Sequence, residues 1–367
     1  MNLSACESEL IRLSRIAGMR PDWVQAGGGN TSVKDGDCLL IKASGRTLAE
    51  LSPDRGIARL SLAVFWEEFL HFKDLASATQ KSLHKGSERP SIETFLHVQM
   101  QKVTLHIHPA FVCSILMHPD YENILKPLFP DALFLKYCTP GKDLGLALID
   151  GLKDRNDQKT LVFLQNHGVI FSGPDVDSVL EMGHDLDSKL LPLLKFEIPF
   201  SRFDIKVLGL VSQIYACFEN PVFVSPITDS LILGVFQSSP NLLYFPPFSP
   251  DILVYCGPKP LKSSLNRLKQ DLLDFRLDYG LDPRILICED NLFIVGQNAK
   301  KAKEIEDVLR FFCFCILGAR SLKRSKNQPS ESASLISHEG LMVLSPKEIE
   351  FLSNWESEKY RRNLGDK

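Results

Sequence analysis

The stretch Val103-Thr-Leu-His-Ile-His108 alternates apolar and polar side chains, and this alternation decides the fold of the region around it. A period of two is typical of a β-strand, because successive side chains point to opposite faces of the sheet. His106 and His108 therefore share one face, where two neutral imidazoles are well placed to bind one divalent ion. The pair alone fits equally well with two strand-end histidines that are satisfied by hydrogen bonds.

A third histidine and a glutamate favour the metal site over that alternative. His167 follows a second apolar run, so it could bring its imidazole from a neighbouring strand, and Glu93 comes shortly before the histidine pair. Three histidine ligands leave one coordination position open, as catalytic zinc sites do. The sequence therefore predicts that His106, His108 and His167 bind a divalent metal with a carboxylate beside it.

The composition is that of a soluble globular protein. Of the 367 residues, 44% are apolar and 24% are charged, and this length suits two domains or one enlarged α/β unit. A net charge of -3 without a Lys/Arg-rich block argues against a nucleic-acid partner. No apolar run approaches the ~20 residues that span a bilayer, and the first residues do not resemble a signal peptide. Nine cysteines without a C-x-x-C pair indicate free thiols, so we expect a cytoplasmic enzyme with no membrane partner.

Hydrophobic periodicity and turn residues predict alternating helices and strands. In the first half we expect a helix over residues 3–19, a hairpin of strands 31–34 and 38–42, and a loop or short helix over 72–90. A helix with Ser91 as its N-cap then leads into a strand over 103–108. Helices from 109 and over 145–153, a strand from 161 that continues to 171, and a helix over 176–194 follow. In the second half we expect a connection over 195–215, strand-length apolar runs at 252–255 and 285–288, helices over 262–279 and 299–317, a linker over 321–336 and a final helix over 348–360.

One internal similarity concerns the second half. Residues 161–173 and 284–296 are both strand-like and end at a glycine before a helix. Aligning Gly173 with Gly296 places Asp290 where His167 stands. Because a β-hairpin followed by a helix is a common unit, chance explains this similarity as well as duplication does. If the unit is duplicated, the second copy lacks the histidine and we expect it to act as a scaffold.

Six short motifs of the first half stand in the order in which the class II aldolase/adducin family carries them. They are Gly29-Asn30-Thr-Ser32, Ser44-Gly45, Ser91-Ile-Glu93, His106-Ile-His108-Pro109, Tyr137-Cys-Thr-Pro-Gly141 and Asn166-His167-Gly168. Residues 1–195 therefore resemble this family, most closely the aldolase part of bifunctional rhamnulose-phosphate aldolase/dehydrogenase proteins. We expect no dehydrogenase domain, since no G-x-G-x-x-G motif follows a strand.

The resemblance implies a three-layer α/β/α domain on a central, mostly antiparallel sheet. We expect this metal-dependent catalytic domain over residues 1–200 and a smaller C-terminal α/β domain of unknown role over 201–367, with a degenerate repeat as one interpretation. The family also implies a homo-oligomer, commonly a tetramer with active sites between subunits. A tyrosine from a neighbouring subunit donates a proton in aldolases of this family, and the sequence does not assign that role to Tyr121 or Tyr137.

The resemblance also implies a reaction and a cofactor. His106, His108 and His167 would hold Zn2+ or a similar ion, which stabilises the enediolate formed when a ketose phosphate is cleaved by a retro-aldol reaction. Glu93 matches the acid/base that moves the proton on the carbon next to the carbonyl, and we expect a partly apolar pocket to raise its pKa. His97 lies on the same helical face as Glu93 and is either its partner or a structural histidine.

Other interpretations of these motifs stay open. The same constellation fits a sugar-phosphate epimerase, a dehydratase or a decarboxylase, and the fold also supports a non-catalytic adducin-like scaffold. Glu93 would be found equally in the first turn of a helix, where the helix dipole favours an acidic side chain. We favour the aldolase, a lyase, because all three histidines are present beside this glutamate.

Four residues match the positions that bind the phosphate of the family's substrates: Asn30, Ser44, Gly45 and Ser91. Glycine-rich turns and helix N-termini offer backbone N–H groups to an anion, although residues 27–29 would also serve simply as a tight turn. Ile92 stands where simple fuculose-phosphate aldolases carry a second serine. The anion would therefore be held differently, with Lys34 or Lys42, or would be a carboxylate instead.

Overall fold

The structure, a computed structural model, describes residues 4–72, 74–153, 155, 157–323 and 331–354. Its first half is built on a seven-stranded sheet with the order β3-β2-β1-β4-β7-β6-β5. The strands are β1 (Asn30–Asp35), β2 (Cys38–Lys42), β3 (Ile57–Ser61), β4 (Val103–Ile107), β5 (Leu133–Leu135), β6 (Thr160–Leu164) and β7 (Gly168–Gly173). Every neighbouring pair is antiparallel except β5 and β6, which confirms the predicted mostly antiparallel sheet.

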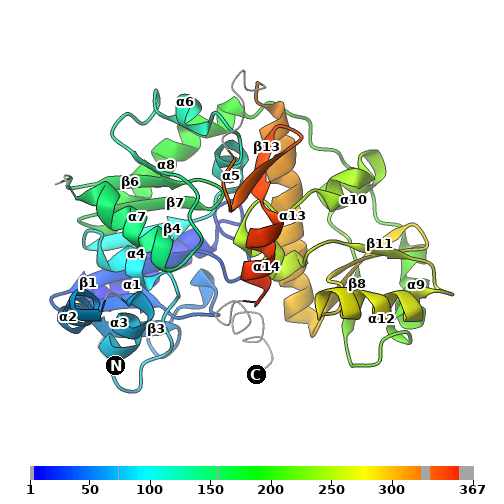
Figure 1. The fold of residues 1–367 in the computed structure, drawn as a ribbon, viewed down its shortest axis with the longest axis horizontal. Helices are drawn as coiled ribbons and strands as arrows, with labels where there is room; N and C mark the ends of the chain where they lie inside the picture. Colours follow the sequence, from blue (N-terminus) through cyan, green and yellow to red (C-terminus); the bar gives the residue numbers. More distant parts are fainter. Residues whose placement is uncertain (1–3, 73, 154, 156, 324–330, 355–367) are drawn as a thin grey trace.

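Helices cover both faces of this sheet and give the three layers expected from the sequence (Figure 1). One face carries α1 (Ala5–Gly18), α5 (Ala110–Leu116), α6 (Tyr121–Leu125) and α8 (Val176–Leu190). The other face carries α2 (Leu62–Phe72), α3 (Leu75–Ser82), α4 (Thr94–Val98) and α7 (Lys142–Leu152). Val103, Leu105 and Ile107 of β4 pack with the first group, so His106 points to the opposite face, as the period of two predicts.

A second, four-stranded sheet lies in the C-terminal half, with the order β8-β11-β10-β9. Its strands are β8 (Phe223–Pro226), β9 (Leu261–Ser263), β10 (Ile285–Cys288) and β11 (Asn291–Gly296). The helices of this half include α9 (Leu208–Tyr215), α10 (Ser230–Ser238), α11 (Pro250–Cys256), α12 (Leu268–Tyr279) and α13 (Ala299–Ser321). A small hairpin of β12 (Leu335–His338) and β13 (Leu341–Leu344) leads into α14 (Pro346–Asn354).

The second sheet repeats the arrangement β4-β7-β6-β5 in strand order, chain order and direction. Helices α10, α12 and α13 follow their strands as α5, α7 and α8 do. Matching Gly173 of β7 with Gly296 of β11 aligns these two strands residue by residue. His106 of β4 and Pro226 of β8 then pair with equivalent positions, each three residues before the matched glycine, so Pro226 corresponds to His106. Because the repeat covers a whole β-α-β-α-β-β-α unit, we infer a duplication whose second copy lacks the histidines.

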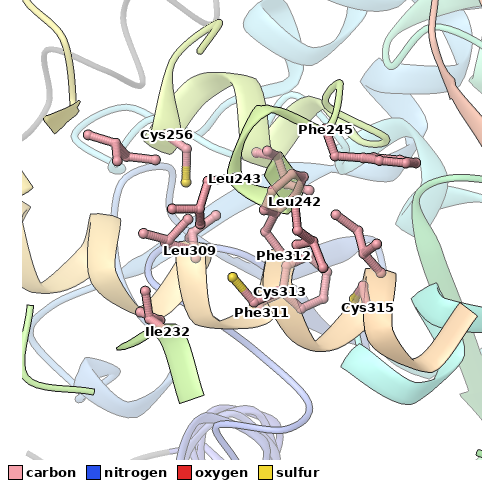
Figure 2. Packing of buried hydrophobic residues seen from close by; sticks show 14 of the residues in the cluster. Ile232, Leu242, Leu243, Phe245, Cys256, Leu309, Phe311, Phe312, Cys313 and Cys315 are labelled. Atoms are coloured by element: carbon pink, nitrogen blue, oxygen red, sulfur yellow. The ribbon is translucent and has the colours of Figure 1, made fainter. Parts of the chain in front are cut away.

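The two halves share one apolar core. Helix α13 packs along α5, and a single buried cluster joins Ala110, Cys113 and Met117 to side chains of α10, α11 and α13. Figure 2 shows the part of this core around Phe312 of α13, with Leu242, Leu243 and Cys256 on the side of the core across from this helix. The domain boundary at residue 200 stays a prediction, because the buried core does not end there.

Replacing Phe312 with alanine is expected to destabilise both halves together. Phe312 is buried and stacks on Phe248, and truncating a buried phenylalanine costs about 3–5 kcal/mol. Thermal unfolding followed by circular dichroism should show one transition at a lower temperature, since both halves contribute to the core. The exposed Phe351 of α14 serves as a control, and its change to alanine should move the transition little. Two separate transitions, of which only one moves in the Phe312 variant, would contradict the shared core.

Several local predictions differ from the structure. Residues 252–255 lie in helix α11 rather than in a strand, because Pro250 at its start and Gly257 after its end bound a short helix whose apolar residues are all buried. The chain reverses after β6 instead of continuing as one strand, with Asn166 in the left-handed region at φ 53°. The connection over 195–215 contains α9, and the helix expected from 262 begins at Leu268, after β9.

The ends of the chain and its cysteines complete the comparison with the sequence. The opening helix is confirmed from residue 5, and Glu7 with Ser4 forms a capping box at its start. Residue 3 and the end of the final helix, from residue 355, lie outside the described residues. All nine cysteines are free thiols. In the part of the chain that the structure describes, no helix has the length and apolar character needed to cross a membrane.

Candidate metal centre

The three histidines come from two neighbouring places on the central sheet. His106 lies near the end of β4 and His108 directly follows that strand, while His167 ends the turn between β6 and β7. Strands β4 and β7 pair with each other, so the turn brings His167 beside the other two imidazoles. Asn166 holds the turn, because its Nδ2 donates to the carbonyl oxygens of Phe248 at 2.9 Å and Met342 at 2.8 Å. The C-terminal half therefore fixes the loop that carries the third histidine.

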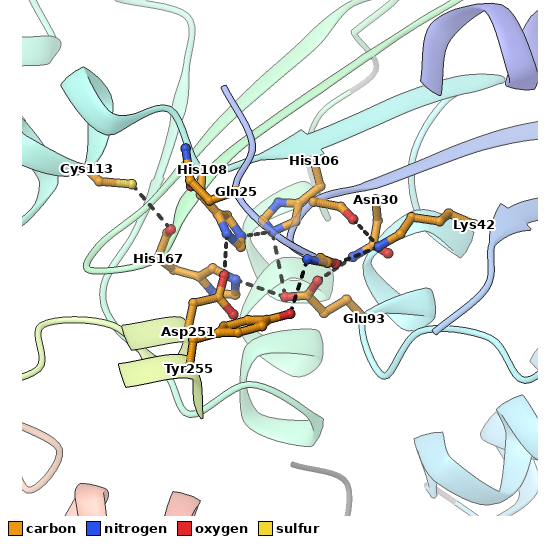
Figure 3. A network of polar contacts seen from close by, with 12 residues as sticks. Gln25, Asn30, Lys42, Glu93, His106, His108, Cys113, His167, Asp251 and Tyr255 are labelled. Atoms are coloured by element: carbon orange, nitrogen blue, oxygen red, sulfur yellow. Dashed lines mark hydrogen bonds and ion pairs between the residues drawn. The ribbon is translucent and has the colours of Figure 1, made fainter. Parts of the chain in front are cut away.

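The four residues expected at the metal site converge on one buried point (Figure 3). One ligand atom from each of Glu93, His106, His108 and His167 lies within 4.8 Å of the others. His167 Nε2 is 2.9 Å from Glu93 Oε1, and His106 Nε2 is 3.6 Å from the same oxygen. His106 Nε2 and His108 Nε2 are 3.0 Å apart. The structure thus brings together all the residues that the sequence selected for this site.

The chemistry of these donors fits a divalent metal ion. Three Nε2 atoms and one carboxylate oxygen of buried residues face one another, and imidazole and carboxylate are both common zinc ligands. Burial lowers the pKa of His106 well below its ordinary value, so the ring is neutral, which is the form that binds metals. Within the described residues, the Nδ1 atoms of His106 and His167 have no hydrogen-bond partner. The Nε2 atoms of the three rings thus make the contacts within the cluster.

Glu93 is held as an anion, contrary to the expectation that its pocket raises its pKa. Burial does act in that direction, but contacts with the surrounding histidines, among them the hydrogen bond from His167 Nε2 at 2.9 Å, outweigh it and hold the pKa of Glu93 well below its ordinary value. Asn30 Nδ2 also donates to Glu93 Oε2 at 2.5 Å. Glu93 is the N-cap residue of α4, yet its side chain makes no capping bond and turns toward the histidines. The helix-dipole interpretation therefore does not account for its position.

One cavity joins the histidine cluster to the residues expected to bind phosphate. Its lining includes Glu93, His108 and His167 at one end, with the glycine-rich turn of residues 27–29 beside them. The cavity is also lined by Asn30, Lys42, Ser44, Gly45, Arg89, Ser91, Ile92, Ser249, Pro250 and Asp251. Asn30, Ser44, Gly45 and Ser91 thus share a cavity with the metal cluster, although the amide nitrogen of Asn30 already bonds to Glu93.

One of the two lysines that the sequence suggested, Lys42, lies at this cavity. Lys34 Nζ donates to the carbonyl oxygens of Val98 and Met100, and burial lowers the pKa of Lys34 to about 8. Lys42 does line the cavity, and its Nζ donates to the carbonyls of the glycine-rich turn at 2.8 Å. Arg89 also lines it, and no motif in the sequence pointed to this residue.

The C-terminal half supplies a residue that sequence reasoning missed. Asp251, in the first turn of α11, places its Oδ2 2.8 Å from His108 Nδ1. One turn later, the hydroxyl of Tyr255 accepts a hydrogen bond from the backbone N–H of Gly27 at 3.1 Å. The only sequence signal for α11 was its apolar run, which was interpreted as a strand. That interpretation hid the fact that Asp251 and Tyr255, four residues apart, lie on one face of a helix.

The remaining candidate residues make contacts away from the cluster. His97 is buried, its Nδ1 lies 2.8 Å from Ser32 Oγ, and burial lowers its pKa to about 3, which suits a structural histidine. Tyr137 donates its hydroxyl hydrogen to Glu348 at 3.0 Å, and Tyr121 donates to Glu122 at 3.2 Å. Neither tyrosine lines the cavity of this chain.

The fold and the converging histidines define a class II aldolase-like domain. Residues 8–188 match the class II aldolase and adducin N-terminal domain, and this part of the chain belongs to that family. No curated protein matches the sequence.

The matches to solved structures cover about half of the chain. The N-terminal class II aldolase domain of a conserved protein from Thermoplasma acidophilum is 24% identical with a TM-score of 0.47, and the match covers 53% of this chain and 96% of that one. L-Fuculose-1-phosphate aldolase from Thermus thermophilus is 18% identical with a TM-score of 0.36, covering 52% and 93%. Sugar-phosphate aldolase from Thermotoga maritima is 16% identical with a TM-score of 0.39, covering 52% and 97%.

Proposed function

We propose that this chain is a metal-dependent lyase that cleaves a ketose phosphate by a retro-aldol reaction. The observation that carries the proposal is the convergence of three imidazoles and one anionic carboxylate at the end of a cavity with a glycine-rich turn. Membership of the class II aldolase and adducin family supports an enzyme of the aldolase, epimerase or decarboxylase type. Aldol cleavage is the member of this group that we favour.

His106, His108 and His167 would hold the metal, with Zn2+ as the ion that suits three imidazoles best. When bound, such an ion supplies Lewis-acid polarisation of the substrate's carbonyl and hydroxyl oxygens. A metal ion binds the neutral form of histidine, and burial favours this form at His106 by lowering its pKa. Removing the ion with a chelator should therefore abolish turnover, and adding Zn2+ back should restore it.

Glu93 would move the proton on the carbon next to the substrate carbonyl. Its low pKa keeps it in the base form, which removes that proton in the condensation direction. In the cleavage direction the same group would first accept the proton that the substrate's hydroxyl group loses as the carbon–carbon bond breaks, and would then deliver it to that carbon. Asn30 fixes one carboxylate oxygen of Glu93 at 2.5 Å, so the other oxygen, Oε1, stays on the side of the histidines.

The phosphate would bind at the opposite end of the cavity. Ser91, Ser44 and Gly45 offer hydroxyl and backbone N–H groups there, and Arg89 adds a cation near Ile92, where a hydroxyl donor is missing. The N–H of Ser44 donates to the carbonyl of Arg89 at 2.9 Å, so these two segments are held together. We propose that Arg89 compensates for the serine that Ile92 replaces.

Changing Arg89 to leucine is expected to raise the KM for the phosphorylated substrate by roughly 10- to 100-fold, because hydrogen bonds to charged groups contribute about 1.5–3 kcal/mol. The kcat should change much less, since the phosphate does not react. Steady-state kinetics on a ketose phosphate would measure both values. Arg55, exposed in a neighbouring turn and outside the cavity, gives the matched control Arg55→Leu, which should leave KM unchanged. An Arg89 variant with the KM of the unchanged protein would exclude this role.

The reaction itself is tested with the purified full chain, Zn2+ and a panel of ketose phosphates. Release of a triose phosphate together with an aldehyde is the expected result. Metal-dependent turnover that yields only an isomer, or that releases water or carbon dioxide, would replace cleavage with epimerase, dehydratase or decarboxylase activity. Absence of both metal binding and turnover would point instead to a non-catalytic, adducin-like protein.

Two further features are part of this proposal. The second sheet, with Pro226 in the place of His106, would be a degenerate copy that supports the first. Family membership also leads us to propose a homo-oligomer, a tetramer by resemblance, and sedimentation of the purified chain measures its size.

A further inference from the structure

Helix α11 lies against the histidine cluster although it belongs to the C-terminal half (Figure 3). Its residue Asp251 is 2.8 Å from His108, and the two side chains are only 15% and 8% exposed. A carboxylate this deeply placed needs a partner, because burying an unpaired charge is costly. The contact joins two segments that the family match separates, since that match ends at residue 188.

The atoms in this contact determine what it does to His108. A neutral imidazole carries one hydrogen, and a carboxylate beside Nδ1 accepts it, so the hydrogen stays on Nδ1 and the electron pair on Nε2. His108 Nε2 points toward His106, 3.0 Å away, which is the side on which a metal would bind. In metal sites, a carboxylate on the far nitrogen fixes the orientation of a histidine ligand and raises its basicity.

His108 differs from the other two histidines in this respect. The Nδ1 atoms of His106 and His167 have no hydrogen-bond partner in the part of the chain that the structure describes. Their rings are held by their strand and turn, with His106 completely buried on β4. His108 lies just beyond the end of β4 and is therefore the ligand that gains most from a side-chain partner.

The surroundings hold Asp251 in this position. Phe248, just before α11, accepts the hydrogen bond from Asn166 beside His167, and Tyr255 accepts one from Gly27. A Cβ atom on Gly28 would lie 3.3 Å from Asp251 Oδ2 and 3.5 Å from His108 Nδ1, so the absence of a side chain there leaves room for the pair. The segment around α11 thus contacts both sides of the histidine cluster.

We propose that Asp251 is a positioning residue, which orients His108 and fixes its hydrogen on Nδ1, so that the C-terminal half completes the metal site. The inference rests on the metal site of the proposed function. It assigns a role to the second half that goes beyond that of a scaffold. An acidic residue placed at a helix N-terminus only for the helix dipole would have no effect on the metal or on the ring of His108.

The test compares Asp251→Ala, Asp251→Asn and the control Asp271→Ala in the full chain. Asp271 is also an acidic residue in the first turn of a C-terminal helix, α12, and it lies outside the cavity. Zinc affinity is measured by competition with a chelating dye. Asp251→Ala should weaken zinc binding by about 10- to 100-fold. Asp251→Asn should weaken it less, because the amide oxygen still accepts a hydrogen bond, and Asp271→Ala should not weaken it.

A second readout does not depend on the metal. The ring nitrogen shifts of 15N-labelled histidine in the metal-free chain report which nitrogen of His108 carries the hydrogen. We expect Nδ1–H in the unchanged chain and in Asp271→Ala, and a mixture of both forms in Asp251→Ala. If the unchanged chain binds no zinc, the metal site fails, but the loss of Nδ1–H in the variant would still support the positioning role.

Unchanged zinc affinity and an unchanged ring in Asp251→Ala would overturn the inference. Should that variant not fold, Asp251→Leu, which is of similar size but has no hydrogen-bond acceptor, decides the question by the same two measurements. A fall in zinc affinity equal to that of Asp271→Ala would likewise overturn it, because the effect would then come from the helix rather than from His108.

Discussion

Replacement of His106 with alanine is expected to abolish stoichiometric zinc binding and to reduce turnover by at least 10³-fold, as the loss of a catalytic metal would. His106 is completely buried, and its Nε2 lies within 3.6 Å of both His108 Nε2 and Glu93 Oε1, so no other residue can take its place without moving the strand. Metal content by mass spectrometry and turnover of the ketose phosphate are the measurements.

A matched control separates loss of the metal from loss of stability. His97 is equally buried but contacts Ser32 outside the cluster, so His97→Ala should cost stability while keeping the metal. Zinc at 1,000 times its Kd stabilises a folded chain by about 4 kcal/mol, which raises the Tm. Added zinc should therefore raise the Tm of the unchanged chain and of His97→Ala, but not of His106→Ala. A His106 variant that still gains stability from zinc would show that this histidine is not a ligand.

Changing Glu93 to glutamine is expected to lower kcat by about 10²- to 10⁴-fold, which is the usual contribution of a general acid/base. The amide keeps the size of the carboxylate, and its oxygen can still accept the hydrogen bond from Asn30, so the cavity should keep its shape. The loss would thus come from the missing base, since the three histidines remain to hold the metal.

Proton exchange measures this step without carbon–carbon bond cleavage. The protein should catalyse exchange of one carbon-bound hydrogen of a triose phosphate with deuterium from the solvent, and Glu93→Gln should not. Glu88→Gln is the control, because Glu88 is a nearby glutamate that pairs with Arg46 outside the cavity. Exchange at the normal rate in the Glu93 variant would assign the proton transfer to another group.

The sequence was sufficient for the part of the site that depends on local periodicity. Alternation in β4 places His106 on the face opposite to Val103, and the structure has this arrangement. The partnership with His167 depends on strand pairing between β4 and β7, which the order of family motifs implied and periodicity alone does not. The direction of the pKa shift of Glu93 was predicted wrongly, because three neighbouring imidazoles outweigh the burial that the sequence suggested.

Asp251 could not be found in the same way. Helix α11 has seven residues, all of them buried except the half-buried Asp251, so its apolar residues form a run without the 3.6-residue period that marks a surface helix. Its contact with His108 depends on how the C-terminal half packs on the central sheet, and local propensity contains no information about such packing. Arg89 was missed for a related reason. It reaches the cavity from a loop, and loop residues have no periodic pattern that would predict their position.

Local sequence patterns were also insufficient to establish the similarity between the two sheets. Aligning Gly173 with Gly296 suggested a hairpin and a helix in common, which chance could explain. Only the strand order and directions of the second sheet extend the likeness to a whole unit. Under the duplication that we propose, the two copies would have diverged at a position that matters for chemistry, since Pro226 stands in the place of His106.

X-ray absorption at the zinc edge of the zinc-loaded full chain tests the central claim most directly. The account predicts one zinc per chain, with three imidazole nitrogens at about 2.0–2.1 Å and oxygen in the remaining coordination. The imidazole signal should fall by one ligand in a variant that lacks His108 or His167. A zinc ion bound only by oxygen or sulfur, or an imidazole count that does not change in those variants, would contradict the assignment of the metal to His106, His108 and His167.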